Sequence, residues 1–257
     1  MDDPKTYYTS GIAYYNQGNY AEAASCFQKA VELDPNDGYA YCNLGGCYMM
    51  LRQFQEAAAA LSRAVELVPA DSKSWSNLGL AARELGEYKQ AIVCYEQAIK
   101  LDPRDAIAHY GIGYCHILLE QFRESIPYLE TSAGLDPENA EAVFRLGYVR
   151  FLCKEYTLAS ECFTRAMRLA PDSAEVHYNL GIVRGTMGDH QQSAAHLRKA
   201  VQLDPDGADM YYNLGNACLH LGLHEEAEES FRKAKDLYTH QGDPAKAREA
   251  ETRLIRL

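Results

Sequence analysis

Residues 72–105 read SKSWSNLGLAARELGEYKQAIVCYEQAIKLDPRD, and the same order of residue types returns along the chain every 34 residues. Proline marks this period most clearly, at Pro35, Pro69, Pro103, Pro137, Pro171 and Pro205. A fixed period between about 20 and 50 residues is typical of one supersecondary unit copied and stacked. The sequence therefore predicts seven repeats, each numbered below from position 1 to position 34. The repeats are 4–37, 38–71, 72–105, 106–139, 140–173, 174–207 and 208–241.

Glycine occupies position 8 of every repeat. These residues are Gly11, Gly45, Gly79, Gly113, Gly147, Gly181 and Gly215. A glycine inside a helix costs about 1 kcal/mol relative to alanine, so seven in register need a common reason. We expect two helices to approach closely there, with glycine facing the alanine or serine at positions 20 and 27. Positions 4, 7, 8 and 11 lie on one stripe of a helix. Each repeat is thus predicted to be a helical hairpin.

Helix boundaries agree with this interpretation. Asp37, Asp71, Asp105, Asn139 and Ser173 close their repeats, where side-chain acceptors for the next helix belong. The proline two residues earlier ends the preceding helix. After the seventh repeat, residues 243–257 predict a final helix that begins at Asp243 and covers the last hairpin with an apolar stripe.

The third repeat places Trp75 at position 4, Leu78-Gly79 at 7–8, alanine at 20 and 27, and Pro103 at 32. This pattern resembles the tetratricopeptide repeat family, and the resemblance extends over residues 4–241. Two repeats depart from it, with Ser10 in place of leucine and Thr239 in place of proline. The resemblance implies an all-α, right-handed superhelical solenoid of antiparallel helical hairpins. We expect residues 1–257 to form a single repeat domain that binds other proteins.

Composition narrows the class of partner and compartment. The net charge of −11 argues against nucleic acid or an anionic membrane as the main partner. Hydrophobic residues make up 47% of the chain but form no run near the ~20 residues of a membrane span. The eight cysteines include no C-x-x-C pair, and the N-terminus lacks a signal-like stretch. These features favour a reducing, cytoplasmic compartment.

No catalytic motif is present, so we expect a protein that is not an enzyme and needs no cofactor. The chain contains no G-x-S-x-G, P-loop, H-E-x-x-H or calcium-loop sequence. His220 and His224 are four residues apart and close to Cys218, which superficially indicates a metal site. They flank the turn between two predicted helices, and we favour a structural role for them. We therefore predict no metal site.

The resemblance implies that positions 2, 5, 6, 9, 12 and 13 line a concave wall. In the fourth and fifth repeats this wall is aromatic. Position 6 is asparagine in four repeats, at Asn43, Asn77, Asn179 and Asn213, and this series is interrupted by Gly111 and Arg145. Tyrosine-rich apolar patches suit protein interfaces, and an asparagine amide can bind a peptide backbone. Packing between neighbouring repeats remains an alternative role for part of each set. The predicted peptide-binding residues are Asn43, Asn77, Tyr110, Tyr114, Phe144, Arg145, Tyr148, Phe151, Asn179 and Asn213.

The favoured function is a scaffold or adaptor that binds an extended or helical peptide segment of a partner protein. A second hypothesis is a scaffold that self-assembles through its ends, with Tyr7 and Tyr14 at the N-terminal edge joining copies into a homo-oligomer. A third is the regulatory, substrate-recruiting arm of a larger enzyme complex. A repeat architecture serves many functions, so the fold cannot choose among these three hypotheses.

Overall fold

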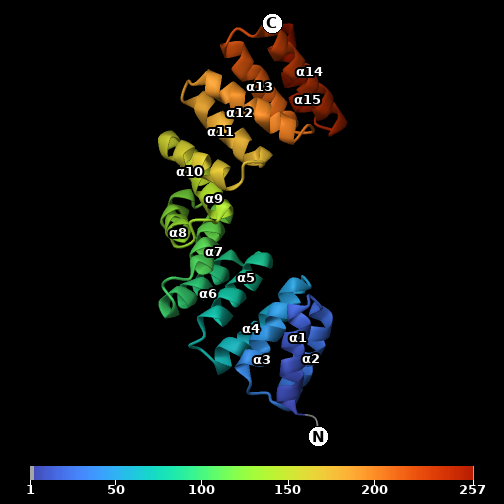
Figure 1. Ribbon diagram of the computed structural model, residues 1–257. Coiled ribbons are helices and arrows are strands. Elements are labelled where there is room, and N and C mark those ends of the chain that lie inside the picture. The colour runs from blue at the N-terminus through green and yellow to red at the C-terminus, as the bar shows by residue number, and fades with distance from the viewer. Residues whose placement is uncertain (1–2, 257) are drawn as a thin grey trace. The chain divides into compact units, whose positions relative to one another are not determined.

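The computed structural model describes residues 3–256, and over this range the chain forms fifteen α-helices and no strand (Figure 1). The helices are α1 (Pro4–Asn16), α2 (Tyr20–Leu33), α3 (Gly38–Met50), α4 (Phe54–Leu67), α5 (Ser72–Glu84), α6 (Tyr88–Leu101), α7 (Ala106–Leu118), α8 (Phe122–Leu135), α9 (Ala140–Leu152), α10 (Tyr156–Leu169), α11 (Ala174–Thr186), α12 (His190–Leu203), α13 (Ala208–His220), α14 (His224–His240) and α15 (Pro244–Ile255). The all-α prediction is confirmed, as are seven helical hairpins followed by one more helix. Leu257, the end of the predicted final helix, lies outside the described residues.

The helices divide into two compact units, Met1–Asp136 with α1–α8 and Pro137–Leu257 with α9–α15. Within each unit the two helices of a repeat pack as a hairpin, and the second helix packs on the first helix of the next repeat. Each unit therefore carries its own core, and the two are described separately below. That residues 1–257 act as one domain stays a prediction.

The helix starts confirm the predicted caps. Each of the five predicted residues accepts a hydrogen bond from a backbone N–H in the first turn of the following helix. The pairs are Asp37 with Ala40, Asp71 with Ser74, Asp105 with Ala108, Asn139 with Ala142, and Ser173 with Val176. Gly207 makes no side-chain cap before α13. Such caps stabilise a helix by about 1 kcal/mol each, so they explain the sharp boundaries of the repeat.

The position-8 glycines mark a close approach, but the group they face differs from the expectation. A Cβ at Gly45 would lie 2.5 Å from the side chain of Leu61, and one at Gly79 would lie 2.8 Å from the ring of Tyr95. In every repeat the neighbour includes the large residue at position 24, not only the small residues at 20 and 27. The small residues let the helices approach, and the glycine makes room for a bulky side chain. A small residue does face the glycine in the fourth and sixth repeats, where the backbone oxygens of Ser125 and Ser193 lie 3.3 Å from the added Cβ, and the large position-24 side chain is a neighbour that the sequence analysis did not expect.

Position 4 fastens the turn between repeats. In three repeats its side chain donates a hydrogen bond to the proline carbonyl that precedes the repeat. The pairs are Trp75 Nε1 with Pro69 (2.9 Å), His109 Nε2 with Pro103 (3.1 Å) and His177 Nε2 with Pro171 (3.0 Å). The fifth repeat has Val143 there, which cannot donate. Its proline, Pro137, instead receives a hydrogen bond of 2.8 Å from Arg165 on α10.

The turn inside each hairpin contains one left-handed residue, at position 15. Four repeats place glycine there, as at Gly18 and Gly86, with φ near +80°. Three repeats place Arg52, Glu120 or Lys154 there, with φ between 58° and 65°. A residue with a Cβ pays a conformational cost in this region that glycine avoids. These three turns are therefore strained relative to the other four.

All eight cysteines are free thiols. Burial raises the pKa of Cys94 to about 11 and that of Cys47 to about 12, so both stay protonated at neutral pH. Such thiols behave as small apolar core residues. Within residues 3–256, no helix is long and apolar enough to cross a membrane.

Candidate functional site

The first helices of successive repeats form the inner side of each unit. In Met1–Asp136, α3 contacts α5 and α5 contacts α7, and in Pro137–Leu257, α9 contacts α11 and α11 contacts α13. Each of these pairs is separated in sequence by a single second helix, so first helices that contact each other line the inner side of their unit. Side chains at positions 5, 6, 9 and 12 of the first helices are thus placed along one face of each unit.

A stacked pair of tyrosines lies on this face in the first unit. The rings of Tyr110 and Tyr114 on α7 are 5.8 Å apart and nearly parallel, at 8°. Both side chains are half-buried. The guanidinium of Arg83, on α5, lies 5.3 Å from the centre of the Tyr114 ring, a distance at which a cation is attracted to a ring face. These three residues, the Tyr110–Tyr114–Arg83 cluster, combine flat apolar area with a positive charge.

Arg83 is held in place by its own neighbours. Its Nη2 and Nε donate to Glu84 Oε1 at 2.6 and 3.2 Å, and its side chain is only 17% exposed. Burial on its own would lower the pKa of Arg83, but the hydrogen bonds to Glu84 and the charges around it raise that pKa. The guanidinium therefore stays charged, and it is fixed beside the two rings.

In the second unit the predicted aromatic residues divide between core and surface. Phe144 is only 4% exposed, and its ring centre lies 5.5 Å from that of Phe163 on α10. Tyr8 and Tyr212 make the same contact with position 24 of their own repeats. In these three repeats the position-5 ring folds inward over its hairpin, so Phe144 offers little of its ring to a partner, contrary to the expectation.

The other predicted residues of that region keep accessible surface. Tyr148 and Phe151 on α9 are half-buried, and the Phe151 ring lies 5.6 Å from that of Tyr156. Arg145 donates from Nε to Glu141 at 2.6 Å, and its guanidinium lies 5.7 Å from the Phe144 ring. These side chains belong to the second unit and Tyr110 and Tyr114 to the first. Whether a partner contacts both sets stays a prediction.

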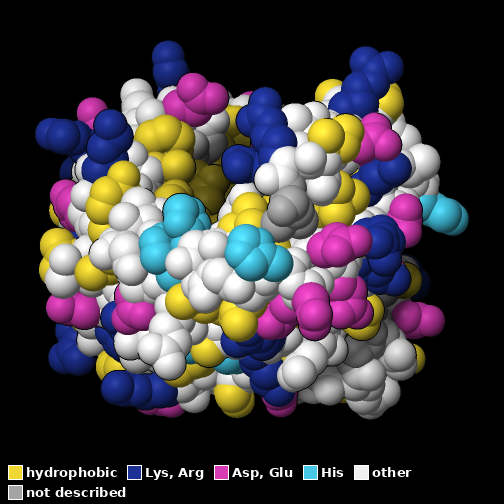
Figure 2. All heavy atoms as spheres, turned by 90° about the horizontal axis from the view of Figure 1, so that it is seen from above, with side chains coloured by type: hydrophobic (Ala, Val, Ile, Leu, Met, Phe, Trp, Pro, Cys, Tyr) yellow, Lys and Arg dark blue, Asp and Glu magenta, His cyan; other side chains and the backbone are white. Residues whose placement is uncertain are grey.

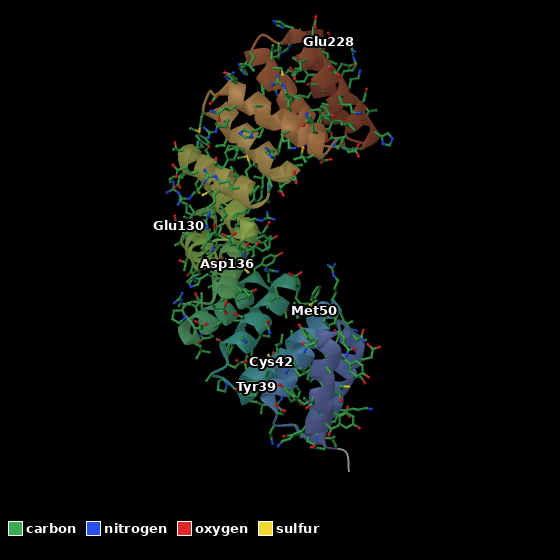
Figure 3. All side chains as sticks on the ribbon, in the orientation of Figure 1. Tyr39, Cys42, Met50, Glu130, Asp136 and Glu228 are labelled. Atoms are coloured by element: carbon green, nitrogen blue, oxygen red, sulfur yellow. The ribbon has the colours of Figure 1, made fainter. Side chains whose placement is uncertain are left out.

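The asparagines at position 6 hydrogen-bond to the preceding repeat. Asn43 Nδ2 donates to the Tyr8 hydroxyl at 3.0 Å, and Asn213 Nδ2 donates to the Tyr178 hydroxyl at 3.1 Å. Asn77 Nδ2 lies 3.9 Å from the sulfur of Cys42, a residue labelled in Figure 3. Each of these nitrogens therefore serves the packing of two repeats. Each of these amides also has a side-chain oxygen that can accept a hydrogen bond from a peptide.

Asn179 is the exception, and the reason lies one repeat earlier. Position 5 of that repeat is Phe144, whose ring has no acceptor for a hydrogen bond. Asn179 Nδ2 instead donates to the carbonyl of Glu175 on its own helix, at 2.9 Å. Asn213 makes the equivalent bond to its own helix, to the Asp209 carbonyl at 2.8 Å, in addition to its bond to Tyr178. Asn179 therefore differs from Asn213 in lacking the bond between repeats.

Gly111 interrupts the asparagines because of packing. A Cβ at this position would lie 2.4 Å from Cζ of Tyr95, which is fully buried. Tyr95 is the only tyrosine at position 24, where the other repeats have leucine or phenylalanine. Its ring is longer than a leucine and reaches the next repeat. The interruption at Gly111 is therefore explained by the packing of Tyr95.

The C-terminal helix α15 takes the place that a further repeat would occupy. Its Glu249 accepts a hydrogen bond of 2.6 Å from the Tyr212 hydroxyl, much as Asn213 meets Tyr178. Lys246 Nζ lies 2.9 Å from a carboxylate oxygen of Asp209, which also accepts from the Tyr238 hydroxyl at 2.6 Å. Ala247 and Ala250, on α15 itself, are buried against residues of the last hairpin. Polar bonds and apolar packing together fasten α15 to the last hairpin.

A pocket that the sequence prediction missed lies in the second unit, between α11, α12 and α13. Its volume is about 250 Å³, and Gly185, Leu197 and Ala217 contribute to its lining. The rings of His190 and His220 at the pocket are stacked 4.1 Å apart at 9°. Its signal in the sequence is the glycine at position 12, where each other repeat has a long side chain.

The histidines and the surface charges give no other site. His220 stacks on His190, and no group of three His, Cys, Asp or Glu residues within 3–256 is arranged to hold a metal ion. Acidic and basic side chains both occur around the face seen in Figure 2. Although the net charge of the chain is −11, this face carries no patch made of acidic side chains alone.

Stacked helical hairpins of 34 residues place the chain in the class of helical repeat proteins. Comparison with family models identifies the family within that class. Models described as tetratricopeptide repeat or TPR repeat match residues 8–72, 79–118, 106–139, 139–206 and 178–240. Together the matches extend over most of the chain. The chain belongs to the tetratricopeptide repeat family.

Solved structures agree on the fold. A MamA protein is 26% identical, with a TM-score of 0.62 over 68% of this chain and 95% of its own. YrrB, described as a TPR protein with an unusual peptide-binding site, is 24% identical, with a TM-score of 0.65 over 73% of this chain and 96% of its own. The pilF protein of Pseudomonas aeruginosa is 18% identical, with a TM-score of 0.70 over 81% of this chain and 94% of its own. No curated protein sequence matches the chain.

Proposed function

We propose that this chain is a non-enzymatic adaptor that binds an extended or helical segment of another protein along the inner face of its first helices. The observation that carries the proposal is the Tyr110–Tyr114–Arg83 cluster. Two rings stacked 5.8 Å apart beside a fixed guanidinium form a rigid surface. Binding to a rigid surface loses little side-chain entropy, and tyrosine and arginine are the residues that dominate interface energies.

Polar groups on the same face complement the rings. The side-chain oxygens of Asn43 and Asn77 can accept hydrogen bonds from a peptide backbone, while their nitrogens are used within the stack. The cation of Arg83 favours an acidic or aromatic group in the partner. The proposed contact set in the first unit is therefore the cluster and these two asparagines. In the second unit it comprises Arg145, Tyr148, Phe151, Asn179 and Asn213, with Phe144 beneath them as support.

The test is selection of peptides from a displayed random library, followed by affinity measurement of a selected peptide. Tyr114→Ala is expected to weaken binding by about 1–3 kcal/mol, as truncation of an interface anchor does. The matched control is Val93→Ala, because Val93 is an exposed apolar residue on the second helix α6. Both variants must first show wild-type circular dichroism. Equal losses in the two variants, or no selected peptide at all, would contradict the proposal.

Self-assembly through the N-terminal end is a second candidate, and one observation favours it. Tyr14 on α1 is 38% exposed, whereas the Tyr7 ring is half-buried with Lys29 Nζ 5.4 Å from its centre. An exposed tyrosine on the first helix offers apolar area to a second copy. Self-assembly would be supported over peptide binding if the molar mass in solution rose with protein concentration and this rise were absent in Tyr14→Glu. The roles of a regulatory enzyme arm and of a cytoplasmic protein stay predictions.

A further inference from the structure

Position 12 of the repeat carries a long side chain everywhere except in the sixth repeat. The residues in order are Tyr15, Met49, Arg83, Ile117, Phe151, Gly185 and Leu219. Position 12 lies near the end of each first helix, and its side chain contacts its own repeat, as Tyr15 does with Tyr20, or the next one, as Arg83 does with Tyr114. The sixth repeat lacks such a side chain.

The pocket between α11, α12 and α13 lies at the unfilled position. It borders Gly185 and has a volume of about 250 Å³, with apolar contributions from Ile182, Leu197 and Ala217. Its polar lining includes Asn213 and Asn216, and no Asp, Glu, Lys or Arg contributes to it. A pocket without charge favours a neutral occupant, because a buried unpaired charge is costly.

Two other repeats show one kind of group that can occupy this position, while the seventh repeat has the aliphatic Leu219 there. In the first and fifth repeats the position-12 ring packs against an aromatic ring at position 17. The pairs are Tyr15 with Tyr20 at 5.3 Å and Phe151 with Tyr156 at 5.6 Å between ring centres. In the sixth repeat position 17 is His190, which has no ring at position 12 to meet. It stacks on His220 of the next repeat instead, at 4.1 Å.

We propose that the Gly185 pocket binds one aromatic side chain of a partner's peptide segment, which takes the place of the missing position-12 residue. The inference rests on the proposed peptide-binding function and adds a specific side-chain preference to it. A cavity of about 150 Å³ already holds benzene, so the Gly185 pocket has room for phenylalanine, tyrosine or tryptophan. Asn213 and Asn216 supply polar groups for the segment's main chain.

The probe is N-acetyl-phenylalanine amide, titrated into the full chain while the methyl signals of Ile182, Leu197 and Ala217 are followed by NMR. Saturable shifts of these three methyls are expected at millimolar concentrations, as befits a small ligand. N-acetyl-glutamate amide and N-acetyl-leucine amide serve as the charged and aliphatic comparisons. Both are expected to bind more weakly.

Filling the pocket from within tests its location. Gly185→Leu copies the residue of the seventh repeat and is expected to abolish the saturable shifts. Gly134→Leu is the matched control, because Gly134 is an exposed helical glycine with nothing within 4 Å of its missing Cβ. A Cβ at Gly185 would lie 3.0 Å from Ser193 Oγ. If Gly185→Leu disturbs folding, Gly185→Met, with its more adaptable side chain, gives the same test.

The outcomes separate this inference from the broader function. Shifts that persist in the folded, filled variant, no saturable shift in the wild type, or equal binding of the leucine amide would each overturn it. If library peptides still bind through Tyr114 in any of those cases, the adaptor function stands and only the pocket assignment fails. If the probe binds Gly185 but no library peptide is selected, the adaptor function is the part that fails.

Discussion

The amide nitrogen of Asn43 donates a 3.0 Å hydrogen bond to the hydroxyl of Tyr8, 35 residues earlier in the chain. The same relationship joins Asn213 to Tyr178 at 3.1 Å. A residue that the repeat pattern associates with ligand binding therefore also connects neighbouring repeats. The asparagines proposed to bind a peptide thus also contribute to the packing of the repeats.

Tyr8→Phe is expected to lower the free energy of unfolding by about 1 kcal/mol, because a part-buried hydrogen bond is lost and Asn43 loses its acceptor. Urea denaturation measures the change. Asn179→Ala is the matched control, since that asparagine bonds only to its own helix. If Tyr8→Phe and Asn179→Ala have the same effect, the bond between repeats contributes nothing of its own.

Gly111→Asn restores the residue common at position 6, yet it is expected to destabilise the first unit by about 1–3 kcal/mol or more. The new Cβ would overlap the ring of Tyr95, and overpacking of a core has this cost. Tyr95→Leu in the same chain should recover part of the loss by shortening the ring. A double-mutant cycle measures the coupling, and additive effects would show that the two residues do not compete for space.

Phe144→Ala is expected to lower the free energy of unfolding by about 3–5 kcal/mol, as truncation of a buried phenylalanine does. Phe151→Ala on the same helix should cost clearly less, because its ring is only half-buried. Thermal and urea unfolding of the two variants, side by side, measure the difference. A small effect of Phe144→Ala would return that ring to the candidate binding residues.

Arg52→Gly is expected to stabilise the chain by about 0.5–1 kcal/mol, because Arg52 has φ of 60° and glycine adopts this conformation without a steric cost. Glu120→Gly and Lys154→Gly should act in the same direction. Arg52→Ala separates the backbone effect from loss of the side chain, since alanine keeps the Cβ. The urea midpoint should rise for glycine alone, and an equal rise for alanine would remove the backbone explanation.

Acid is expected to weaken the attachment of α15 through Asp209. Partial burial opposes ionisation of this carboxyl, but hydrogen bonds from Tyr238 and Lys246 outweigh it and hold its pKa below the usual value. Its contribution to stability is therefore complete above the unfolded pKa of about 3.9 and disappears as pH falls through the lower folded pKa. Asp209→Asn should cost about 1 kcal/mol at neutral pH, given its exposure.

The measurement is the urea midpoint of wild type and Asp209→Asn between pH 6 and pH 3. The gap between the two curves should narrow towards the acid end, because protonation of Asp209 removes the interactions that the variant already lacks. A constant gap across this range would show that the carboxylate charge does not fasten α15.

The period, the hairpins and the caps follow from local rules, which is why the sequence was sufficient to predict them. An Asp at the end of a repeat caps a helix whatever lies around it, as Asp37 and Asp71 do. The large neighbour of each glycine was missed because it is a side chain at position 24 of another helix. Phe144 was placed on the surface for the same reason, since helical spacing does not tell which way a ring at the edge of a stripe folds.

The pocket at Gly185 was missed because its signal is an absent side chain. The asparagines at position 6 are noticeable because they recur, whereas Gly185 is noticeable only because the other six repeats have a larger residue at position 12. At Gly111 the opposite holds: the side chain is also missing, but the ring of Tyr95 fills the space. Side-chain packing, here the ring of Tyr95, decides between an opening and a filled space.

The bond from Arg165 to the Pro137 carbonyl has a consequence for how repeats diverge. At four turns a proline carbonyl accepts one side-chain hydrogen bond, and the donor is tryptophan, histidine or an arginine from another helix. Substitution at position 4 is therefore tolerated once a second residue has taken over the hydrogen bond. Val143, released from that requirement, is now 1% exposed. Two repeats can thus diverge in sequence while the same proline carbonyl in each turn still accepts a hydrogen bond.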